Sequence, residues 1–188
     1  RDDGANWTEA TCPAFPEGYE INAVTEFGNR QEPAVVKCLY TLVPNGPDGH
    51  YLMGTDPGGL FATTDAGETW TVNDPLWTLR NEHNWFEGGG GVMLHHVDID
   101  PNDPQRMHIA VSCAGVYETR DGGQSWKPRN KGVVVDFLPE KYPDYGQDTH
   151  MLARGRQDSN VLWQQNHCGN MRSTDGGLNW TDVTAGLP

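Results

Sequence analysis

The stretch Ser173-Thr174-Asp175-Gly176-Gly177-Leu178-Asn179-Trp180 decides the fold, because it recurs along the chain. Thr63–Trp70 and Thr119–Trp126 have the same form: Ser or Thr, any residue, Asp, any residue, Gly, any residue, a small polar residue, Trp. Asp2–Trp7 is a shorter copy that keeps the Asp, the Gly and the Trp in register. We call this pattern the box. Four copies in register indicate a protein built from structural repeats.

The spacing of residues within the box predicts a tight turn. An Asp side chain can accept hydrogen bonds from nearby backbone N–H groups and so hold a turn. The Gly two residues later can take a positive φ without steric cost. The Trp then begins the return strand of a hairpin, with a large apolar ring to bury. We therefore expect structural roles for the box residues Asp2, Asp65, Asp121, Asp175, Trp7, Trp70, Trp126 and Trp180.

The distance between boxes predicts the architecture. The box Asp residues stand at positions 2, 65, 121 and 175, so the spacings are 63, 56 and 54 residues. Periods of this order are typical of a propeller with one four-stranded blade per repeat. The predicted fold is all-β: a partial β-propeller of four-stranded antiparallel blades, with each box at the turn between the third and fourth strands. No segment shows a convincing helical period over several turns.

Short apolar runs between turn-rich segments mark the remaining strands. Within each period we expect an inner strand, a second strand and a third strand that begins with Gly, followed by the box. The expected inner strands are Val36–Val43, Leu94–Ile99 and Thr149–Arg154; the second strands are Tyr51–Gly54, Met107–Val111 and Val161–Gln164; the third strands are Gly59–Phe61, Gly115–Tyr117 and Gly169–Met171.

The boxes resemble Asp-box repeats, also called bacterial neuraminidase (BNR) repeats. These occur in sialidases, in xyloglucan-cleaving propeller hydrolases, in sortilin-type peptide receptors and in a photosystem assembly factor. The stretch 54–188 looks closest to bacterial sialidase-like or glycosyl-hydrolase-like repeat proteins, and the segments Leu94–Pro101 and Gln164–Gly169 carry this closer match. The resemblance implies a propeller fold, but its members include both enzymes and receptors.

Length and charge bound the domain and its partners. The chain has 188 residues and three full periods, whereas propellers usually close with four to eight blades. We therefore expect residues 1–188 to form one partial propeller domain, about three blades plus the end of another, completed by further blades of the same protein. A net charge of −13 argues against nucleic acid and anionic membranes as partners. The compartment stays open: a soluble bacterial protein, either cytoplasmic or secreted, is expected.

The four cysteines show no metal-type pairing such as C-x-x-C. Cys113 and Cys168 fall at nearly matching positions of neighbouring repeats, so a disulfide between them is conceivable. Buried free thiols are the expected state of the cysteines.

A ligand site is expected at the end of the blades opposite the boxes, where two long loops, Asn73–Met93 and Lys131–Asp148, enter the inner strands. Aromatic side chains there would stack on sugar faces, and polar side chains would bind hydroxyl groups or a carboxylate. The expected substrate-binding residues are Trp77, Arg80, His83, Trp85, Gln147, Asn166 and His167.

The catalytic candidates come from repeat register. His95 and His150 occupy corresponding places at the start of two consecutive inner strands, and Asp148 lies two residues before His150. Residues two apart in a strand point to the same side, so Asp148, His150 and His95 are the predicted catalytic residues. Alternatively, the histidines bond backbone carbonyls of a wet channel and the tryptophans fill gaps between blades. A metal site formed by His95, His150 and His167 is a less favoured alternative; neither a metal nor a cofactor is expected.

Two functions remain open. A glycosidase ordinarily needs two carboxyl groups across the scissile bond; Asp148 is the first candidate, and Glu82 and Asp136 follow. The favoured function is a carbohydrate-active propeller, similar to glycoside hydrolases or sialidases, that binds a carbohydrate or another small polar ligand. The alternative is a non-catalytic propeller that recognises a protein or peptide partner.

Overall fold

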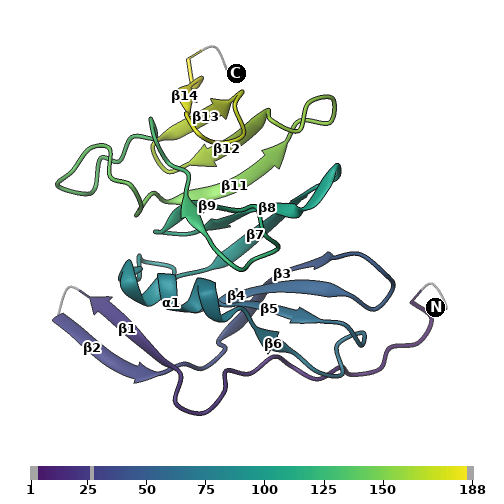
Figure 1. The fold of residues 1–188 in the computed structure, drawn as a ribbon. Coiled ribbons are helices and arrows are strands. Elements are labelled where there is room, and N and C mark those ends of the chain that lie inside the picture. Colours follow the sequence, from purple (N-terminus) through teal and green to yellow (C-terminus); the bar gives the residue numbers. More distant parts are fainter. Residues whose placement is uncertain (1–3, 26–27, 186–188) are drawn as a thin grey trace.

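The computed structural model describes residues 4–25 and 28–185, which fold almost entirely as β-sheet. Three four-stranded antiparallel sheets follow one another along the chain and stack as an arc of blades (Figure 1). Within each sheet, strands that are consecutive in sequence pair with each other. The prediction of a partial β-propeller with four-stranded antiparallel blades is therefore confirmed.

The blades are numbered here in chain order, and the inner strand of each begins at its predicted residue or two residues later. Blade 1 consists of β3 (Cys38–Pro44), β4 (Tyr51–Asp56), β5 (Leu60–Thr63) and β6 (Thr71–Val72). Blade 2 consists of β7 (Leu94–Asp100), β8 (Asp103–Val111), β9 (Gly115–Thr119) and β10 (Lys127–Pro128). Blade 3 consists of β11 (Thr149–Arg154), β12 (Leu162–Asn166), β13 (Gly169–Ser173) and β14 (Thr181–Asp182).

The hydrophobic core lies between the blades, because alternate residues of each strand face opposite neighbours. In β8, Ile109 joins a cluster with Leu52 and Leu60 of blade 1. The next residue, Ala110, joins a second cluster with Leu152 and Met171 of blade 3. Blade 2 is thus buried on both faces, which explains why the run Met107–Val111 is continuously apolar apart from His108.

Each box forms the turn between the third and fourth strands, as predicted. In blade 2, the Thr119 hydroxyl donates to Asp121 Oδ1 at 2.7 Å. The backbone N–H and the hydroxyl of Ser125 donate to the two Asp121 oxygens at 2.9 and 2.5 Å. The backbone N–H of Gly123 donates to Thr119 Oγ1 at 2.9 Å. The first residue of the box is therefore the second fixed point of the turn, a role that the sequence pattern alone did not assign.

The other two complete boxes repeat this geometry. Asp65 accepts from the backbone and hydroxyl of Thr69 at 2.9 and 2.6 Å, and Asp175 accepts from the backbone and side chain of Asn179 at 3.0 and 2.7 Å. The residue between Asp and Gly also adopts a positive φ, and in blade 1 it is Ala66, at 62°. The hydrogen bonds around the Asp thus hold a conformation that favours glycine.

The Trp of each complete box fastens its blade to an earlier part of the chain. For Trp126 and Trp180, the bonded residue leaves the outer strand of the preceding blade, and both rings are buried. The three indole N–H groups donate as follows: Trp70 to Thr11 O at 2.8 Å, Trp126 to Asn73 Oδ1 at 3.1 Å, and Trp180 to Arg129 O at 2.7 Å.

The first, shorter box is only partly described, since Asp2 lies outside the described residues. Gly4 has φ +81, close to the +90 of Gly67, and a Cβ at Gly4 would lie 3.5 Å from the Trp7 ring. In blade 1 the matching distance, from Gly67 to Trp70, is 3.4 Å. The local Gly–Trp geometry of a box is therefore present, although the Trp7 side chain is 90% exposed.

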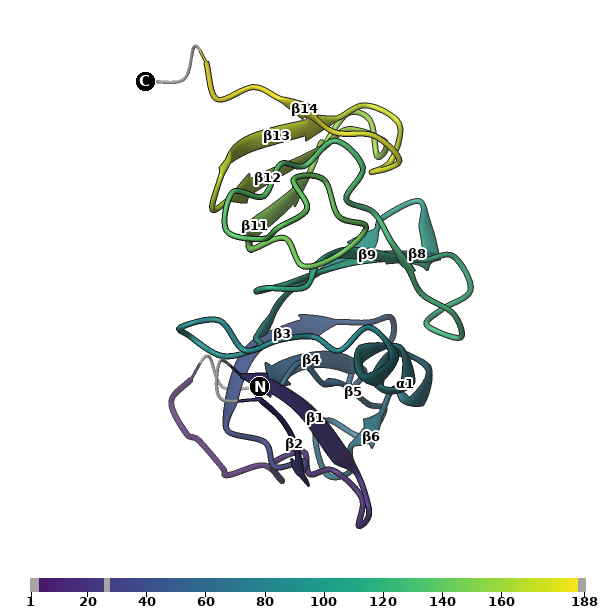
Figure 2. The ribbon, with the colours of Figure 1, turned by 90° about the vertical axis from the view of Figure 1, so that its left-hand side faces the viewer.

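Two elements lie outside the predicted pattern. The helix α1 (Asp74–Glu82) was not predicted, because no segment shows a helical period over several turns. It is short, nine residues, so its period could not be recognised over several turns. Asn73 caps it by accepting from Leu76 N at 2.9 Å. The hairpin of β1 (Glu20–Thr25) and β2 (Gly28–Pro33) was also unpredicted; it packs beside α1, where Asn81 Nδ2 donates to Glu20 O at 3.1 Å (Figures 1 and 2).

A buried ion network joins blades 2 and 3 at the end of the blades that carries the boxes. The Glu118 side chain is fully buried and accepts from Arg106 Nε at 3.0 Å and Arg129 Nε at 2.8 Å. Arg106 continues to Asp100 at 3.3 Å and to the carbonyl of Gly176, within the box of blade 3, at 3.4 Å. Arg154 of blade 3 also pairs with Asp100 at 3.4 Å, so the two blades are connected by charge as well as by apolar packing.

The cysteines are free thiols rather than a disulfide pair. Cys113 is buried and Cys168 half-buried, in line with the expected free state. Cys12 and Cys38 are exposed, which corrects the expectation of burial: Cys12 lies in the segment before the first strand, and Cys38 is the first residue of β3. In the described part of the chain, no helix has the length and apolar character needed to cross a membrane.

Candidate functional site

The end of the blades opposite the boxes is called the distal face here. Antiparallel pairing places three second-to-third-strand turns there, at 56–59, 112–114 and 167–168, together with the loops 83–93 and 129–148. The loop between β10 and β11 runs beside blade 3 in both views (Figures 1 and 2). Turns and loops on a rigid scaffold are where binding and catalytic groups usually lie.

The three inner strands share an irregularity at the distal face. A β-bulge leaves one residue of each inner strand unpaired: Tyr40 between Leu39 and Thr41, His95 between Leu94 and His96, and His150 between Thr149 and Met151. Bulges redirect side chains and are frequent beside active sites. The predicted equivalence of His95 and His150 is therefore real, and Tyr40 is the matching residue of blade 1.

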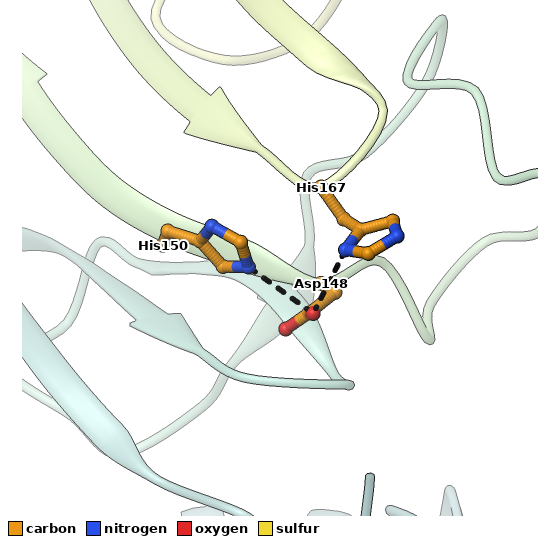
Figure 3. Close-up of side chains that lie close together, drawn as sticks. All are labelled: Asp148, His150 and His167. Carbon is orange, nitrogen blue, oxygen red and sulfur yellow. Dashed lines mark hydrogen bonds and ion pairs between the residues drawn. The ribbon is translucent and has the colours of Figure 1, made fainter. Parts of the chain in front are cut away.

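Asp148, His150 and His167 gather at the distal end of blade 3 (Figure 3). His150 Nε2 lies 3.1 Å from Asp148 Oδ2, and His167 Nδ1 lies 3.8 Å from the same oxygen. The backbone ties the cluster as well, since His167 N donates to Asp148 O at 2.9 Å. One ligand atom from each residue lies within 4.8 Å of the others, so the three could hold a metal ion.

Neighbouring groups fix how the cluster is presented. Cys113 N donates to Asp148 Oδ1 at 3.3 Å, which leaves Oδ2 for the histidines. Gln165 Nε2 donates to His150 Nδ1 at 3.2 Å, so the Nε2 atom of neutral His150 carries the proton and donates to Asp148. The cluster is open to solvent, with side-chain exposures of 21% for Asp148, 40% for His150 and 55% for His167.

His95 does not join this cluster through a hydrogen bond. Its Nε2 lies 2.7 Å from the carbonyl of Thr149 and must therefore donate to it. Burial lowers the pKa of His95, and the Thr149 contact opposes that effect only in part. A neutral His95 that bonds a backbone carbonyl fits the alternative role given above, in which the histidines bond carbonyls of a wet channel. The catalytic role of His95 stays a prediction.

Asp56 is a second carboxylate of the distal face, at the end of β4. Burial raises its pKa, and Lys37 offsets this only in part. Its Oδ1 has no hydrogen-bond partner. A Cβ at Gly91 would lie 3.1 Å from Asp56 Oδ2, and one at Gly88 would lie 2.4 Å from Cys113 Sγ. The Gly88–Gly91 segment therefore runs from Asp56 to the turn that contacts Asp148. Repeat register could have identified Asp56, because it ends the second strand as Asn166 does.

Both predicted sugar-stacking tryptophans pack in the interior. Trp85 is 1% exposed, and its Nε1 donates to the Tyr117 hydroxyl at 2.8 Å. Trp77 is 6% exposed and packs against Phe15, with ring centroids 4.4 Å apart. The exposed edge of Trp77 lines a cleft of about 470 Å³ between the β1–β2 hairpin and α1, which also includes Tyr19 and shares no residue with the Asp148 cluster.

The predicted polar binding residues are engaged within the protein. Arg80 is fully buried, and its Nε donates to Pro57 O at 2.8 Å. Gln147 is also fully buried and donates to Pro143 O at 2.6 Å. Asn166 is 2% exposed and accepts from Cys168 N at 3.1 Å. As folded here, these three side chains shape the distal loops from within.

The remaining candidates lie nearer the surface. His83 is half-buried, stacks on Tyr145 with ring centroids 4.1 Å apart, and has a pKa lowered mainly by burial. Asp136 is exposed and accepts from Cys168 Sγ at 3.2 Å. Glu82 is exposed at the end of α1. Of these three residues, Asp136 is linked to the cluster: its neighbour Phe137 packs edge-on against His167, and Asp136 itself accepts from Cys168, the residue after His167.

Three enzymes are among the curated proteins that are similar to this chain. The chain is 27% identical over 155 residues to an oligoxyloglucan-reducing end-specific xyloglucanase of Emericella nidulans, which covers 74% of this chain and 18% of that protein. It is 23% identical over 176 residues to xyloglucanase Xgh74A of Acetivibrio thermocellus, covering 80% and 20%, and 25% identical over 146 residues to a xyloglucanase of a Paenibacillus species, covering 70% and 13%. The chain thus spans about a fifth or less of the relatives' length.

Solved structures support the fold independently. The crystal structure of an ancestral GH74 enzyme superposes with a TM-score of 0.55 at 14% identity, over 81% of this chain and 19% of that one. No family model matches the sequence. The fold is therefore that of a propeller of the kind found among glycoside hydrolases.

Proposed function

We propose that this chain is part of a carbohydrate-active propeller related to glycoside hydrolases, acting on a polysaccharide of the xyloglucan class. The observation that carries this proposal is the similarity to three proteins named xyloglucanases over 70–80% of the chain. A polar distal face and a net charge of −13 suit a neutral sugar better than a polyanion. The repeated boxes favour membership of the Asp-box class named above.

The distal face is the proposed ligand site, and Asp56 and Asp148 are its proposed carboxyl pair. Hydrolysis of a glycosidic bond needs one carboxylic acid to protonate the leaving oxygen and one carboxylate to act as base or nucleophile. Burial raises the pKa of Asp56, which suits the acid role. Asp148 accepts from Cys113 N and from His150, which suits a group that works as a carboxylate.

Further blades of the same protein are proposed to complete the ring. Apolar side chains stand exposed on the two outer flanks of the arc: Tyr40 at 43% and Leu42 at 55% on β3, Met151 at 55% on β11 and Trp163 at 42% on β12. Contiguous exposed apolar groups on sheet faces mark surfaces that other structure covers. Residues 1–188 would then contribute three blades and the end of another to a larger domain.

The test is a hydrolysis assay on the protein with xyloglucan, a mixed-linkage β-glucan and a sialylated oligosaccharide. Release of reducing ends from xyloglucan alone is the expected result. Asp56→Asn and Asp148→Asn should each lower turnover by about 100-fold or more, since general acid–base groups contribute that much. Asp175→Asn, at the far end of blade 3, is the matched control and should keep turnover. Equal activity in all variants would place the chemistry elsewhere.

A non-catalytic propeller that binds a partner is the second candidate. The observation that favours it is the burial of Trp85, Arg80, Gln147 and Asn166, which removes four predicted binding side chains from the distal surface. Binding of xyloglucan or of a peptide without release of reducing ends, lost in Asp148→Asn, would support this candidate over the hydrolase.

A further inference from the structure

The Asp148 cluster has the ligand atoms of a metal site. Two ligands about 2.1 Å from a tetrahedral ion lie about 3.4 Å from each other. The distances from Asp148 Oδ2 to His150 Nε2 and His167 Nδ1 are 3.1 and 3.8 Å, and all three ligand atoms lie within 4.8 Å. The two separations from Asp148 Oδ2 are within a few tenths of an ångström of that value, and movement of the two exposed imidazoles relative to each other would complete the coordinating arrangement.

The backbone holds two of these ligands in place without a metal. His167 N donates to Asp148 O, which couples β11 to the turn after β12. The Cys113 N–H occupies Asp148 Oδ1, so Oδ2 is the oxygen directed at both imidazoles (Figure 3). Phe137 packs edge-on against the His167 ring, with centroids 5.5 Å apart, and limits its rotation. A preorganised ligand set of this kind reduces the entropy lost on binding.

Gln165 supplies an outer contact of the type that metal-binding histidines use. It lies 3.2 Å from His150 Nδ1. When Nε2 of His150 coordinates an ion, Nδ1 must carry the proton, and the carboxamide of Gln165 can turn its oxygen to accept it. Gln165 can therefore bond His150 in either case: it donates to Nδ1 when no ion is bound and accepts from Nδ1 when His150 coordinates an ion.

We propose that Asp148, His150 and His167 form a binding site for a divalent transition-metal ion of the zinc type, and that a bound ion and the carboxylate role proposed above for Asp148 exclude each other, because both use Oδ2. Two imidazoles and one carboxylate favour Zn²⁺, Co²⁺ or Ni²⁺ over Ca²⁺ and Mg²⁺, which take oxygen ligands. Three protein ligands leave a position open for water or a ligand oxygen. The set differs from the three-histidine site weighed from the sequence, because His95 bonds the Thr149 carbonyl and Asp148 takes its place.

The test is calorimetric titration of ZnCl₂ into the protein in the absence of any sugar, so that its outcome is independent of hydrolysis. Cys12 and Cys38 are exposed thiols and should first be replaced by Ser, because thiolates also bind zinc. One ion should bind per chain. His150→Ala and His167→Ala should weaken binding at least about tenfold, and Gln165→Leu should weaken it about 10–100-fold as an outer-shell change.

His50→Ala is the matched control. The side chain of His50 has no contact in the cluster, and its hydrogen bonds use backbone atoms, so zinc affinity should not change. Both cluster histidines are exposed, so their variants should fold; equal melting temperatures would verify this. A crystal soaked in Co²⁺ should show anomalous density about 2.0–2.2 Å from the three ligand atoms. The proposal would be overturned if zinc binding were not saturable, or if His150→Ala and His167→Ala bound zinc as tightly as the protein that keeps both histidines.

Discussion

Replacing Glu118 by Gln should destabilise the protein strongly, because Glu118 is the carboxylate at the centre of the buried ion network of blade 2. The carboxylate is fully buried and receives guanidinium groups from Arg106 and Arg129, together with Arg120 Nη2 at 3.0 Å. Gln keeps the shape but removes the negative charge and points an amide N–H₂ group at cationic donors. Arg106, itself only 8% exposed in its side chain, then loses its main counter-charge.

The size of this loss of stability depends on the partners that Arg106 keeps in the variant. Removing one partner of a buried ion pair costs about 3–5 kcal/mol. Arg106 keeps Asp100 at 3.3 Å and the Asn160 carboxamide at 3.0 Å, so we expect the low end, about 3 kcal/mol. For a protein of this size each kcal/mol shifts the melting temperature by about 2–4 °C, so Glu118→Gln should lower it by about 6–12 °C.

The assay is thermal unfolding followed by circular dichroism at pH 7, with two controls. Arg120→Ala removes a 57% exposed partner of the same carboxylate and should cost under about 1 kcal/mol. Glu68→Gln changes an exposed Glu in the box of blade 1 and should leave the melting temperature unaltered. A loss of less than about 2 °C in Glu118→Gln, under about 1 kcal/mol, would refute the view that the buried Glu118 carboxylate stabilises blade 2 through its arginine partners.

The pH dependence of stability provides a second test of the role of ionised Glu118. Burial opposes ionisation of Glu118, but hydrogen bonds from Arg120, Arg129 and Arg106 outweigh it, and the folded pKa is lowered. A lowered folded pKa contributes stability above the unfolded pKa, and that contribution is lost as the pH falls through the folded value. The difference in stability between the wild type and Glu118→Gln should therefore be full at pH 7 and shrink on acidification.

Three further outcomes are expected. Asp175→Ala should lower stability by about 1–2 kcal/mol, because the Ser173 hydroxyl loses its acceptor while the exposed Asn179 donors turn to water. Xyloglucan turnover at a fixed temperature below melting should be unchanged. A loss of turnover would contradict the structural role of Asp175. Hydrogen bonds from Thr69 lower the pKa of Asp65 to about 2, so the stabilisation of the folded protein by ionised Asp65 should be present above about pH 4 and be lost as the pH falls through 2. NMR titration of Thr69→Val should show a higher Asp65 pKa. An unchanged pKa would disprove that the Thr69 hydrogen bond is the cause of the shift. The isolated residues 1–188 should self-associate through Leu42 and Met151, and sedimentation of a compact monomer at all concentrations would contradict the exposed flanks.

The sequence by itself determined the blades, because the information for each turn lies within eight residues. The box carboxylate, its donors and its Gly are so close in the chain that no distant contact is needed to form the turn. Counting from the boxes, which set a common register, also predicted where the inner strands begin and that His95 and His150 occupy equivalent positions. The helix α1 was missed because nine residues give too few turns for a period.

Which side chains of the distal loops are available to a ligand could not be predicted from the sequence, because it depends on how the loops pack. Trp85, Arg80 and Gln147 look like sugar-binding residues in the sequence, yet their partners Tyr117, Pro57 and Pro143 O bury them. Burial depends on which loops pack against one another, and long loops have no repeating pattern to predict this. The raised pKa of Asp56 and the approach of His167 to Asp148 and His150 were decided the same way, because both depend on strands, loops and turns that are apart in the sequence and adjacent in space.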